Sequence, residues 1–407
     1  MAARSEMSGN SSPDHSDTAS LVIVCNSVPP YRVHLHRRIA REVPELKLLT
    51  VVTHENHTDR WRYDPPAEIN AILFGPGEES SQQGSVRFAR HEWHKGGRII
   101  QWLEARDVRA VVVCGYNDLA RIRIIFWCRR KGIPCFISGD ANILIDNPRG
   151  MKRVVKHLVL QPVLRAATGI FPCGRNGEAF FLRYGARPNR IHLFPYEPDI
   201  EEIQLLDASY IGSVREQFGL ASHRRRIVFS GRLIELKRVD LLIDAFVKTV
   251  ASARPEWDLL IIGDGPLRNA LESLVPGWLR GRVHWTGFLG NQRQVGALYR
   301  ASDVFAFPSN REQWALVIPE AAAAGLALVV ASTVGSAVEF VHDGINGQLF
   351  PPDDLPALTR SLLNVTQEGK IEAMKAASHR QLADWRVRND PVQGLRRALS
   401  ENRVLKR

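Results

Sequence analysis

The chain contains few cysteines and no long apolar run. Its five cysteines are Cys25, Cys114, Cys128, Cys135 and Cys173. Their number is odd, and their spacing matches neither a zinc site nor a C-x-x-C redox pair, so we expect free thiols, buried where they fall in apolar runs, in a reducing compartment. No apolar stretch reaches the roughly 18–20 residues that a membrane-spanning helix needs. Residues 1–18 are polar and lack the apolar core of a secretory signal, which predicts a disordered tail.

Acidic residues are outnumbered: 43 Asp and Glu stand against 54 Lys and Arg, for a formal net charge of +11. A positive balance suits solubility, attraction to phosphate-bearing ligands, or attraction to an anionic membrane or nucleic acid, and charge alone does not choose among these. The sequence has no RNA- or DNA-binding signature and no pattern of aromatic residues among basic ones. We therefore expect no nucleic-acid partner.

The remaining composition is typical of a globular protein. Hydrophobic residues make up 44% of the 407 residues and charged residues 24%, which is enough apolar material for a substantial core. At roughly 100–200 residues per domain, this length predicts two domains. This composition, together with the lack of a recognisable signal sequence or membrane span, predicts a cytoplasmic protein.

Short apolar runs alternate with longer amphipathic stretches along most of the chain, which predicts an α/β fold with parallel sheets covered on both faces. In the first half we expect strands at 21–25, 48–52, 110–114, 134–138 and 169–171, and helices at 34–42, 98–105 and 120–131. In the second half we expect strands at 226–230, 257–262, 283–285, 304–307 and 327–331, and helices at 239–250, 266–274, 294–301 and 319–324.

The alternation breaks at the P-Y-E-P-D stretch that begins at Pro195 and then restarts, which indicates a domain boundary. We expect a tail at 1–18, a first Rossmann-like, doubly wound domain at 19–197, a linker at 198–213, a second such domain at 214–370, and a helical segment at 371–407 that packs back on the first domain. Two such domains face each other across a cleft, and ligands of these sheets bind outside the carboxyl ends of the strands.

A glycine and two basic residues follow the first strand of the second half. Gly231 permits a sharp turn or a close approach of a ligand to the backbone. Arg232 and Lys237 then lie in the loop at the carboxyl end of that strand, where a guanidinium fork and an ammonium suit a diphosphate. A solvated basic loop is the alternative, and this segment alone leaves it open.

Two further glycines follow the next strand, in the stretch G-D-G-P. Gly263 and Gly265 allow a ligand to approach the backbone, and Pro266 suits the first position of a helix. A tight turn between strand and helix explains the same residues equally well.

Two glutamates stand eight positions apart, at Glu312 and Glu320. Pro319 places Glu320 in the first turn of a helix, and Glu312 falls in the preceding loop. Carboxylates accept hydrogen bonds from polyhydroxy groups, which suits a sugar ring and a ribose. The alternatives are a favourable charge at a helix start for Glu320 and an exposed loop residue for Glu312.

A loop of small residues, S-T-V-G-S-A, follows a fifth buried strand and includes Gly335 and Ser336. The N–H groups at the start of the next helix offer an anion site. A plain helix start capped by Ser336 is the alternative. All four segments follow predicted strands, so we expect them on one rim of the second domain.

The order and spacing of these segments resemble one family. From about residue 227 to 363, the matching stretches are GRLIELKRVD, IIGDGP, LYRASDVFAFPS, EQWALVIPEAAAAG and EFVHDGINGQLFPPDD. They resemble the retaining glycosyltransferases of the GT-B fold that use nucleotide sugars, in the large group 1 (family 4) class with an E-x7-E signature. The resemblance covers most of the second domain and is looser in the first.

The resemblance implies a role for each matching residue. Arg232 and Lys237 would contact the donor diphosphate, Glu320 the ribose and Glu312 the donor sugar. The donor-binding residues that it implies, besides these, are Gly231, Gly263, Gly265, Phe288, Leu289, Leu316, Val317, Gly335 and Ser336.

In the first half, the V-P-P-Y-R-V stretch resembles the first loop of a subset of this family, which would place Pro30, Tyr31 and Arg32 on the acceptor side. Asp140 stands where related chains often have a polar residue that is catalytic or contacts the sugar, and a conformationally restricted loop residue is the alternative there. This chain departs from the family pattern at Gln313 and Ala315, the latter replacing a common glycine, which predicts an altered choice of donor.

The resemblance implies an enzyme that moves a sugar from a UDP- or GDP-sugar to a hydroxyl acceptor, with retention of configuration, no metal and no other cofactor. The alternatives are a nucleotide-sugar epimerase or hydrolase of the same fold and a non-catalytic relative that binds sugar nucleotides.

A basic amphipathic stretch at 149–160 raises a separate hypothesis. It could lie on an anionic membrane that carries a lipid-linked acceptor, which would make the protein peripheral on the inner face of the membrane. A surface helix packed on the first sheet is the alternative.

Overall fold

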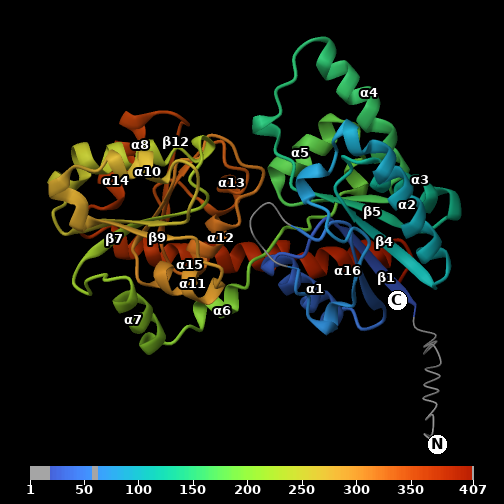
Figure 1. Cartoon of the computed structure of the whole chain (residues 1–407), viewed down its shortest axis with the longest axis horizontal. Helices are drawn as coiled ribbons and strands as arrows, with labels where there is room; N and C mark the ends of the chain where they lie inside the picture. Colours follow the sequence, from blue (N-terminus) through green and yellow to red (C-terminus); the bar gives the residue numbers. More distant parts are fainter. Residues whose placement is uncertain (1–18, 57–62, 406–407) are drawn as a thin grey trace, which may run out of the picture.

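Two parallel sheets of six strands each form the framework of the protein (Figure 1). The computed structural model describes residues 19–56 and 63–405; the predicted tail at 1–18 lies outside them. Within the described residues, no helix has the length and apolar character needed to cross a bilayer.

The first sheet has the strand order β3-β2-β1-β4-β5-β6. Its strands are β1 (Ser20–Cys25), β2 (Lys47–Val52), β3 (Ala71–Leu73), β4 (Val108–Cys114), β5 (Cys135–Gly139) and β6 (Gly169–Pro172). The helices of this domain are α1 (Pro30–Glu42), α2 (Ala89–Glu104), α3 (Leu119–Lys131), α4 (Met151–Ala166) and α5 (Arg175–Arg183). This order is that of a Rossmann domain, as predicted.

The second sheet repeats the same topology, with the order β12-β11-β10-β7-β8-β9. Its strands are β7 (Arg225–Ser230), β8 (Trp257–Ile262), β9 (Val283–Gly287), β10 (Val304–Phe307), β11 (Ala327–Ala331) and β12 (Gly347–Phe350). Its helices are α8 (Val239–Ala245), α10 (Arg268–Ser273), α11 (Gln292–Arg300), α12 (Val317–Ala323), α13 (Ala337–Phe340) and α14 (Leu355–Val365). Strands β8, β10 and β11 are buried along their whole length, because helices cover both faces of the sheet.

The segment predicted as a linker at 198–213 is largely helical. It forms α6 (Ile200–Gln204) and α7 (Ala208–Gln217), which pack on α11. Asp199 and Asp207 cap the two helices by accepting hydrogen bonds from the N–H groups of Glu202 and Tyr210. These aspartates are ordinary helix N-caps, so the sequence carried a signal for both helices.

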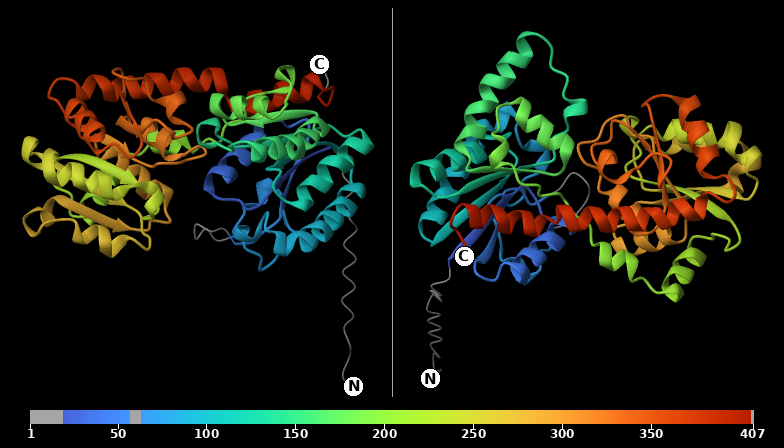
Figure 2. Two further views of the ribbon diagram at one scale, coloured as in Figure 1. Left: turned by 90° about the horizontal axis from the view of Figure 1, so that it is seen from above. Right: turned by 180° about the vertical axis from the view of Figure 1, so that it is seen from behind.

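The last two helices return from the second domain to the first. Figure 2 shows α15 (Ile371–Asn389) and α16 (Pro391–Glu401), in red, running across both lobes. Val392, Leu395 and Leu399 of α16 belong to the same buried cluster as Leu35 of α1 and Phe171 of β6. The C-terminal segment therefore completes the core of the first domain.

Candidate active site

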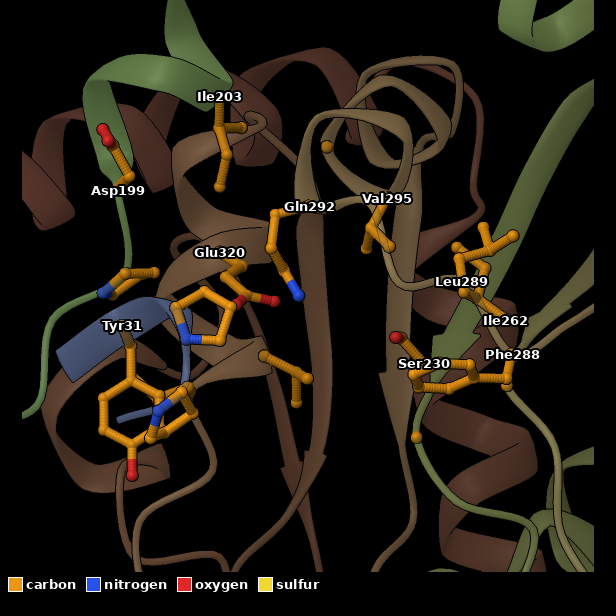
Figure 3. Close-up of a pocket in the computed structure, with 18 of the residues that line it drawn as sticks. Tyr31, Asp199, Ile203, Ser230, Ile262, Phe288, Leu289, Gln292, Val295 and Glu320 are labelled. Atoms are coloured by element: carbon orange, nitrogen blue, oxygen red, sulfur yellow. The ribbon is translucent and has the colours of Figure 1, made fainter. Parts of the chain in front are cut away.

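A cleft of about 1340 Å³ separates the two domains. Its walls come from the loops at the carboxyl ends of the strands in both sheets, which is where a Rossmann sheet binds its ligands. The residues singled out from sequence that line it are Pro30, Tyr31, Gly231, Arg232, Lys237, Gly263, Gly265, Phe288, Leu289, Leu316, Val317 and Glu320. Figure 3 shows how several of these side chains surround the cavity.

Five other residues singled out from sequence do not line this cavity: Arg32, Asp140, Glu312, Gly335 and Ser336. Arg32, Glu312, Gly335 and Ser336 take part in contacts with neighbouring segments of the chain. Their roles toward a donor or an acceptor stay predictions.

Glycines let the loops after β7 and β8 pack backbone to backbone. Gly231 has a φ of 154° and Gly263 a φ of 132°. A Cβ on Gly263 would lie 2.0 Å from the carbonyl oxygen of Gly231, and one on Gly265 would lie 2.5 Å from that of Leu233. A side chain at either position would push apart the two loops that hold Arg232 and Lys237 at the cleft.

Lys237 and Glu312 form an ion pair at the cleft wall. The Lys237 ammonium contacts Glu312 Oε1, and the Ser309 hydroxyl donates to the same oxygen at 2.9 Å. The ammonium also lies 5.2 Å from the centre of the Phe307 ring. The carboxylate of Glu312 thus helps to fix the position of Lys237, and its contact with a donor sugar stays a prediction.

Glu320 of α12 is one of the carboxylates that line the cleft. Its side chain points into the cavity (Figure 3), and the Tyr299 hydroxyl lies 3.5 Å from its Oε2. Burial raises the pKa of Glu320 to about 7, and the contact with Tyr299 offsets only part of that rise. The group therefore changes its charge near neutral pH.

The loop between β10 and α12 contains a strained residue, Ala315, at the position where the sequence pattern of similar chains commonly has glycine. Ala315 has a φ of 68°, in the left-handed region that disfavours side chains by roughly 1–2 kcal/mol. The Ser336 N–H donates to the Trp314 carbonyl at 2.9 Å, and the Ser336 hydroxyl donates to the Ala315 carbonyl at 3.1 Å. These two bonds hold the strained residue in place.

The same bonds bear on the anion site expected at 334–337. The N–H groups of Val334, Ser336 and Ala337 all donate to carbonyls within the protein. Ser336 precedes α13 without capping it by its side chain. This loop therefore uses its polar groups to shape the neighbouring loop, and contact with a phosphate there stays a prediction.

On the first domain, Arg32 builds the loop between β1 and α1. Its guanidinium is buried and donates to Asn26 Oδ1 at 2.7 Å and to the Ser27 carbonyl at 3.0 Å. Burial, together with the nearby Glu312 charge, raises the pKa of Asp140, and the Arg32 guanidinium opposes that rise. A carboxyl group with a raised pKa beside a cleft is a candidate proton carrier.

Several polar residues on the first domain's side of the cleft carry no local sequence signal for a binding role. His34, Arg37 and Asp199 line the cavity, and His34 Nδ1 lies 3.1 Å from Asp199 Oδ2. They come from α1 and from the segment read as a linker, so only the folded chain brings them together. The helix-capping signal of Asp199 was the one available hint.

One group of described residues has the spacing of metal ligands: His54, Glu78 and Glu92. The Lys95 ammonium lies between the two carboxylates, 2.7 Å from Glu92 Oε1 and in contact with Glu78. The lysine already balances their charge, so we interpret this group as a buried ion-pair cluster between α2 and the loops that follow β2 and β3.

Two Rossmann domains that face each other across such a cleft define the GT-B class of sugar transferases. Comparison with known proteins agrees. The family model for glycosyl transferases group 1 matches residues 224–368. A D-inositol 3-phosphate glycosyltransferase of Xylanimonas cellulosilytica is 34% identical over 347 residues, which are 80% of this chain and 79% of that protein. The chain therefore belongs to the group 1 glycosyltransferases, and it is an enzyme of sugar transfer.

Other known proteins are similar to this chain in sequence or in fold. A phosphatidyl-myo-inositol mannosyltransferase of Mycolicibacterium smegmatis is 29% identical over 174 residues, 42% of this chain and 44% of that protein. Among solved structures, Anabaena HepE in complex with UDP and glucose has a TM-score of 0.69 at 19% identity, covering 95% of this chain and 100% of that chain. Sucrose-phosphate synthase from Thermosynechococcus elongatus has a TM-score of 0.73 at 14% identity, covering 94% and 99%. These structures establish the GT-B fold.

Proposed function

We propose that this glycosyltransferase takes its sugar from a nucleoside-diphosphate sugar bound in the cleft and passes it to a hydroxyl acceptor. The observation that supports this is that Arg232, Lys237 and Glu320 line one cavity. The two cations suit the diphosphate, and the carboxylate suits the ribose hydroxyls. Similar proteins whose structures contain UDP and glucose support the same class of donor.

In this proposal the basic residues act mainly on the leaving group. Negative charge develops on the diphosphate as the glycosidic bond stretches, so cations fixed beside it stabilise the transition state more than the ground state. Arg232 and Lys237 supply that charge, and we propose that no metal is required. We also propose that the acceptor hydroxyl attacks from the face that the diphosphate leaves, with retention of configuration.

A thermal-shift screen with UDP-, GDP- and ADP-sugars tests the choice of donor, because a ligand of the folded state raises the melting temperature. The donor that binds is then incubated with and without a hydroxyl acceptor, and again with EDTA. Transfer to the acceptor that persists in EDTA supports the proposal. Free sugar or an isomerised donor in place of transfer would instead indicate a hydrolase or an epimerase.

The charge of Glu320 makes donor binding depend on pH. If ribose hydroxyls donate to its carboxylate, the affinity for a nucleotide sugar should fall by about tenfold between pH 8 and pH 6, because the ionised fraction falls through a pKa of about 7. The diphosphate diester of the donor does not titrate in this range. Isothermal calorimetry at the two pH values measures the change, and Glu320→Gln should abolish the pH dependence.

Ionisation of Glu320 should strengthen donor binding but lower the free energy of unfolding. Its pKa is raised above that of the unfolded chain, so the native state binds the proton more tightly between about pH 4.5 and 7. The contribution of Glu320 to stability is therefore lost as pH rises through that range. An affinity that stays constant from pH 6 to pH 8 would contradict the ribose role.

We also propose that the N-terminal half of α4 lies on an anionic membrane surface. Figure 1 shows α4 projecting from the first lobe. Its buried residues are confined to the C-terminal half, from Leu160 onward. Met151, Leu158 and Val159 are 75%, 63% and 65% exposed, and Val154 is exposed on the same face.

Basic residues beside this apolar face suit anionic lipid. Lys152 and Arg153 are exposed between the apolar side chains, so the helix can bury an apolar stripe while its cations meet lipid headgroups. The protein would then be peripheral on a membrane, and its hydroxyl acceptor would be carried by a lipid. Light scattering of the protein alone shows whether a second copy covers this face instead.

Flotation with vesicles tests the contact. Leu158→Ser combined with Val159→Ser should lower binding to phosphatidylglycerol-containing vesicles at least about tenfold, because two apolar side chains no longer enter the interface. Val387→Ser is a matched control, since Val387 is 86% exposed on α15. Wild-type protein that stays unbound at low salt would refute the proposal.

A further inference from the structure

The two domains touch through loops that shape the donor side of the cleft. The Arg175 N–H, after β6, donates to Glu339 Oε1 at 2.7 Å. The Asn176 side chain donates to the Gly335 carbonyl at 3.2 Å. A third residue, Asn142, follows β5 and makes the most connected of these contacts.

The Asn142 side chain uses its amide fully in this contact. It is 1% exposed. Its Nδ2 donates to the Glu312 carbonyl at 2.8 Å and to the Thr333 carbonyl at 3.1 Å, both in the second domain. Its Oδ1 accepts from the Leu144 N–H at 3.0 Å, which fixes the side chain to its own loop.

The two carbonyls belong to segments that lie against each other. A parallel bridge joins Glu312 to Val334. A Cβ on Gly335 would lie 1.8 Å from the Gln313 carbonyl and 3.2 Å from Asn142 Nδ2. Backbone atoms therefore fill the space around the Asn142 amide. If this side chain moved away, the segments at Glu312 and at Thr333 would each lose a hydrogen bond to the first domain.

The Glu312 backbone connects this contact to the proposed chemistry. Its carbonyl is held by Asn142, and its carboxylate is held by Lys237 and Ser309. Asp140 lies two positions before Asn142 on the same loop of the first domain. The negative charge of Glu312 raises the pKa of Asp140, in addition to the larger effect of burial. The positions of Lys237 and Asp140 relative to each other therefore depend on how the loop after β5 packs against the second domain.

We propose that Asn142 is a positioning residue for sugar transfer: its amide fixes Glu312, and through it Lys237, across the contact between the two domains. This inference rests on the proposed role of Lys237 at the diphosphate. In the proposed function Arg232 and Glu320 also bind the nucleotide, and the charge on the diphosphate develops mainly in the transition state. Loss of the amide should therefore lower turnover by much more than it lowers nucleotide affinity.

The test compares Asn142→Ala and Asn142→Asp with the wild-type protein. Aspartate keeps the acceptor for Leu144 and loses both donors, whereas alanine loses all three bonds. We expect kcat to fall by about 10- to 100-fold in each, as for a misplaced catalytic group. Calorimetric affinity for UDP or GDP, whichever the wild type binds, should change less than about threefold. Melting temperature checks that each variant is folded.

Asn176→Ala is the matched control, because it removes an interdomain amide that reaches Gly335 and leaves Glu312 untouched. A smaller loss of kcat in this variant supports the inference. Equal losses in Asn142→Ala and Asn176→Ala would overturn it in favour of a general weakening of domain contact, as would a wild-type kcat in folded Asn142→Ala. If Arg232→Ala also retained activity, the diphosphate clamp itself would fail; if only the Asn142 variants retained it, this inference alone would.

Discussion

Arg232→Ala and Lys237→Ala should each lower kcat by about 10²–10³-fold, which corresponds to roughly 2.7–4 kcal/mol of transition-state stabilisation per fixed donor. Both residues line the cleft, and in the proposed reaction each meets the charge that develops on the leaving diphosphate. Steady-state kinetics with the donor identified by thermal shift measure the effect. Arg238→Ala is the control, since Arg238 belongs to the same loop and pairs with Asp240.

The ion pair of Lys237 with Glu312 gives this prediction a second test. Lys237→Ala leaves the Glu312 carboxylate without its cation, so part of the loss could come from the freed carboxylate. In a Glu312→Gln background, that contribution is absent. Turnover that recovers in the double variant would show that the lysine serves only to neutralise Glu312. A loss that persists would assign Lys237 to the donor, and near-wild-type turnover of both single alanine variants would refute the clamp.

Much of the fold could be predicted because the strands are short, apolar and buried on both faces. The strands expected at 257–262, 304–307 and 327–331 match β8, β10 and β11. Strands β3 and β12 were missed, since all three residues of β3 and two of the four residues of β12 are partly exposed. Neither length nor apolar pattern separates such strands from a loop.

The position of a site residue could be predicted where it depends on the neighbouring strand or helix, and could not where it depends on packing between distant segments. Gly231, Arg232 and Glu320 follow strands or begin a helix, so their position at the cleft follows from local sequence and from the topology of a Rossmann sheet. Contacts between residues far apart in the sequence had no such signal. The pairing of Lys237 with Glu312 and the reach of Asn142 into the second domain depend on how the loops and the two domains pack.

A buried carboxylate at the domain boundary shows how that packing is stabilised. Glu197 is 2% exposed. It accepts from Arg38 of α1 and from Arg386 of α15, the latter at 2.8 Å, and Arg38 also pairs with Asp390 between α15 and α16. One carboxylate thus ties the first domain to the helices that return from the second.

Replacing Glu197 with glutamine should lower the free energy of unfolding by about 3 kcal/mol, because removing one partner of a buried ion pair leaves the other charges uncompensated. Arg38 keeps Glu42 and Asp390 as partners, which places the loss at the lower end of the range for such variants. Urea unfolding followed by circular dichroism measures the change through the shift in midpoint.

The matched control is Glu372→Gln, which removes a carboxylate of α15 that is 66% exposed and pairs with Arg225. Exposed pairs contribute at most about 1 kcal/mol, so this variant should unfold close to the wild-type midpoint. A Glu197→Gln midpoint equal to that of the control would mean that apolar packing of α16, through residues such as Leu395 and Leu399, suffices to hold the two domains together. Nucleotide affinity should survive in Glu197→Gln, because the ion-pair partners that the structure describes for this carboxylate lie on α1 and α15 and not in the donor-side loops of the second domain. Transfer should weaken, since the cleft loses its fixed geometry.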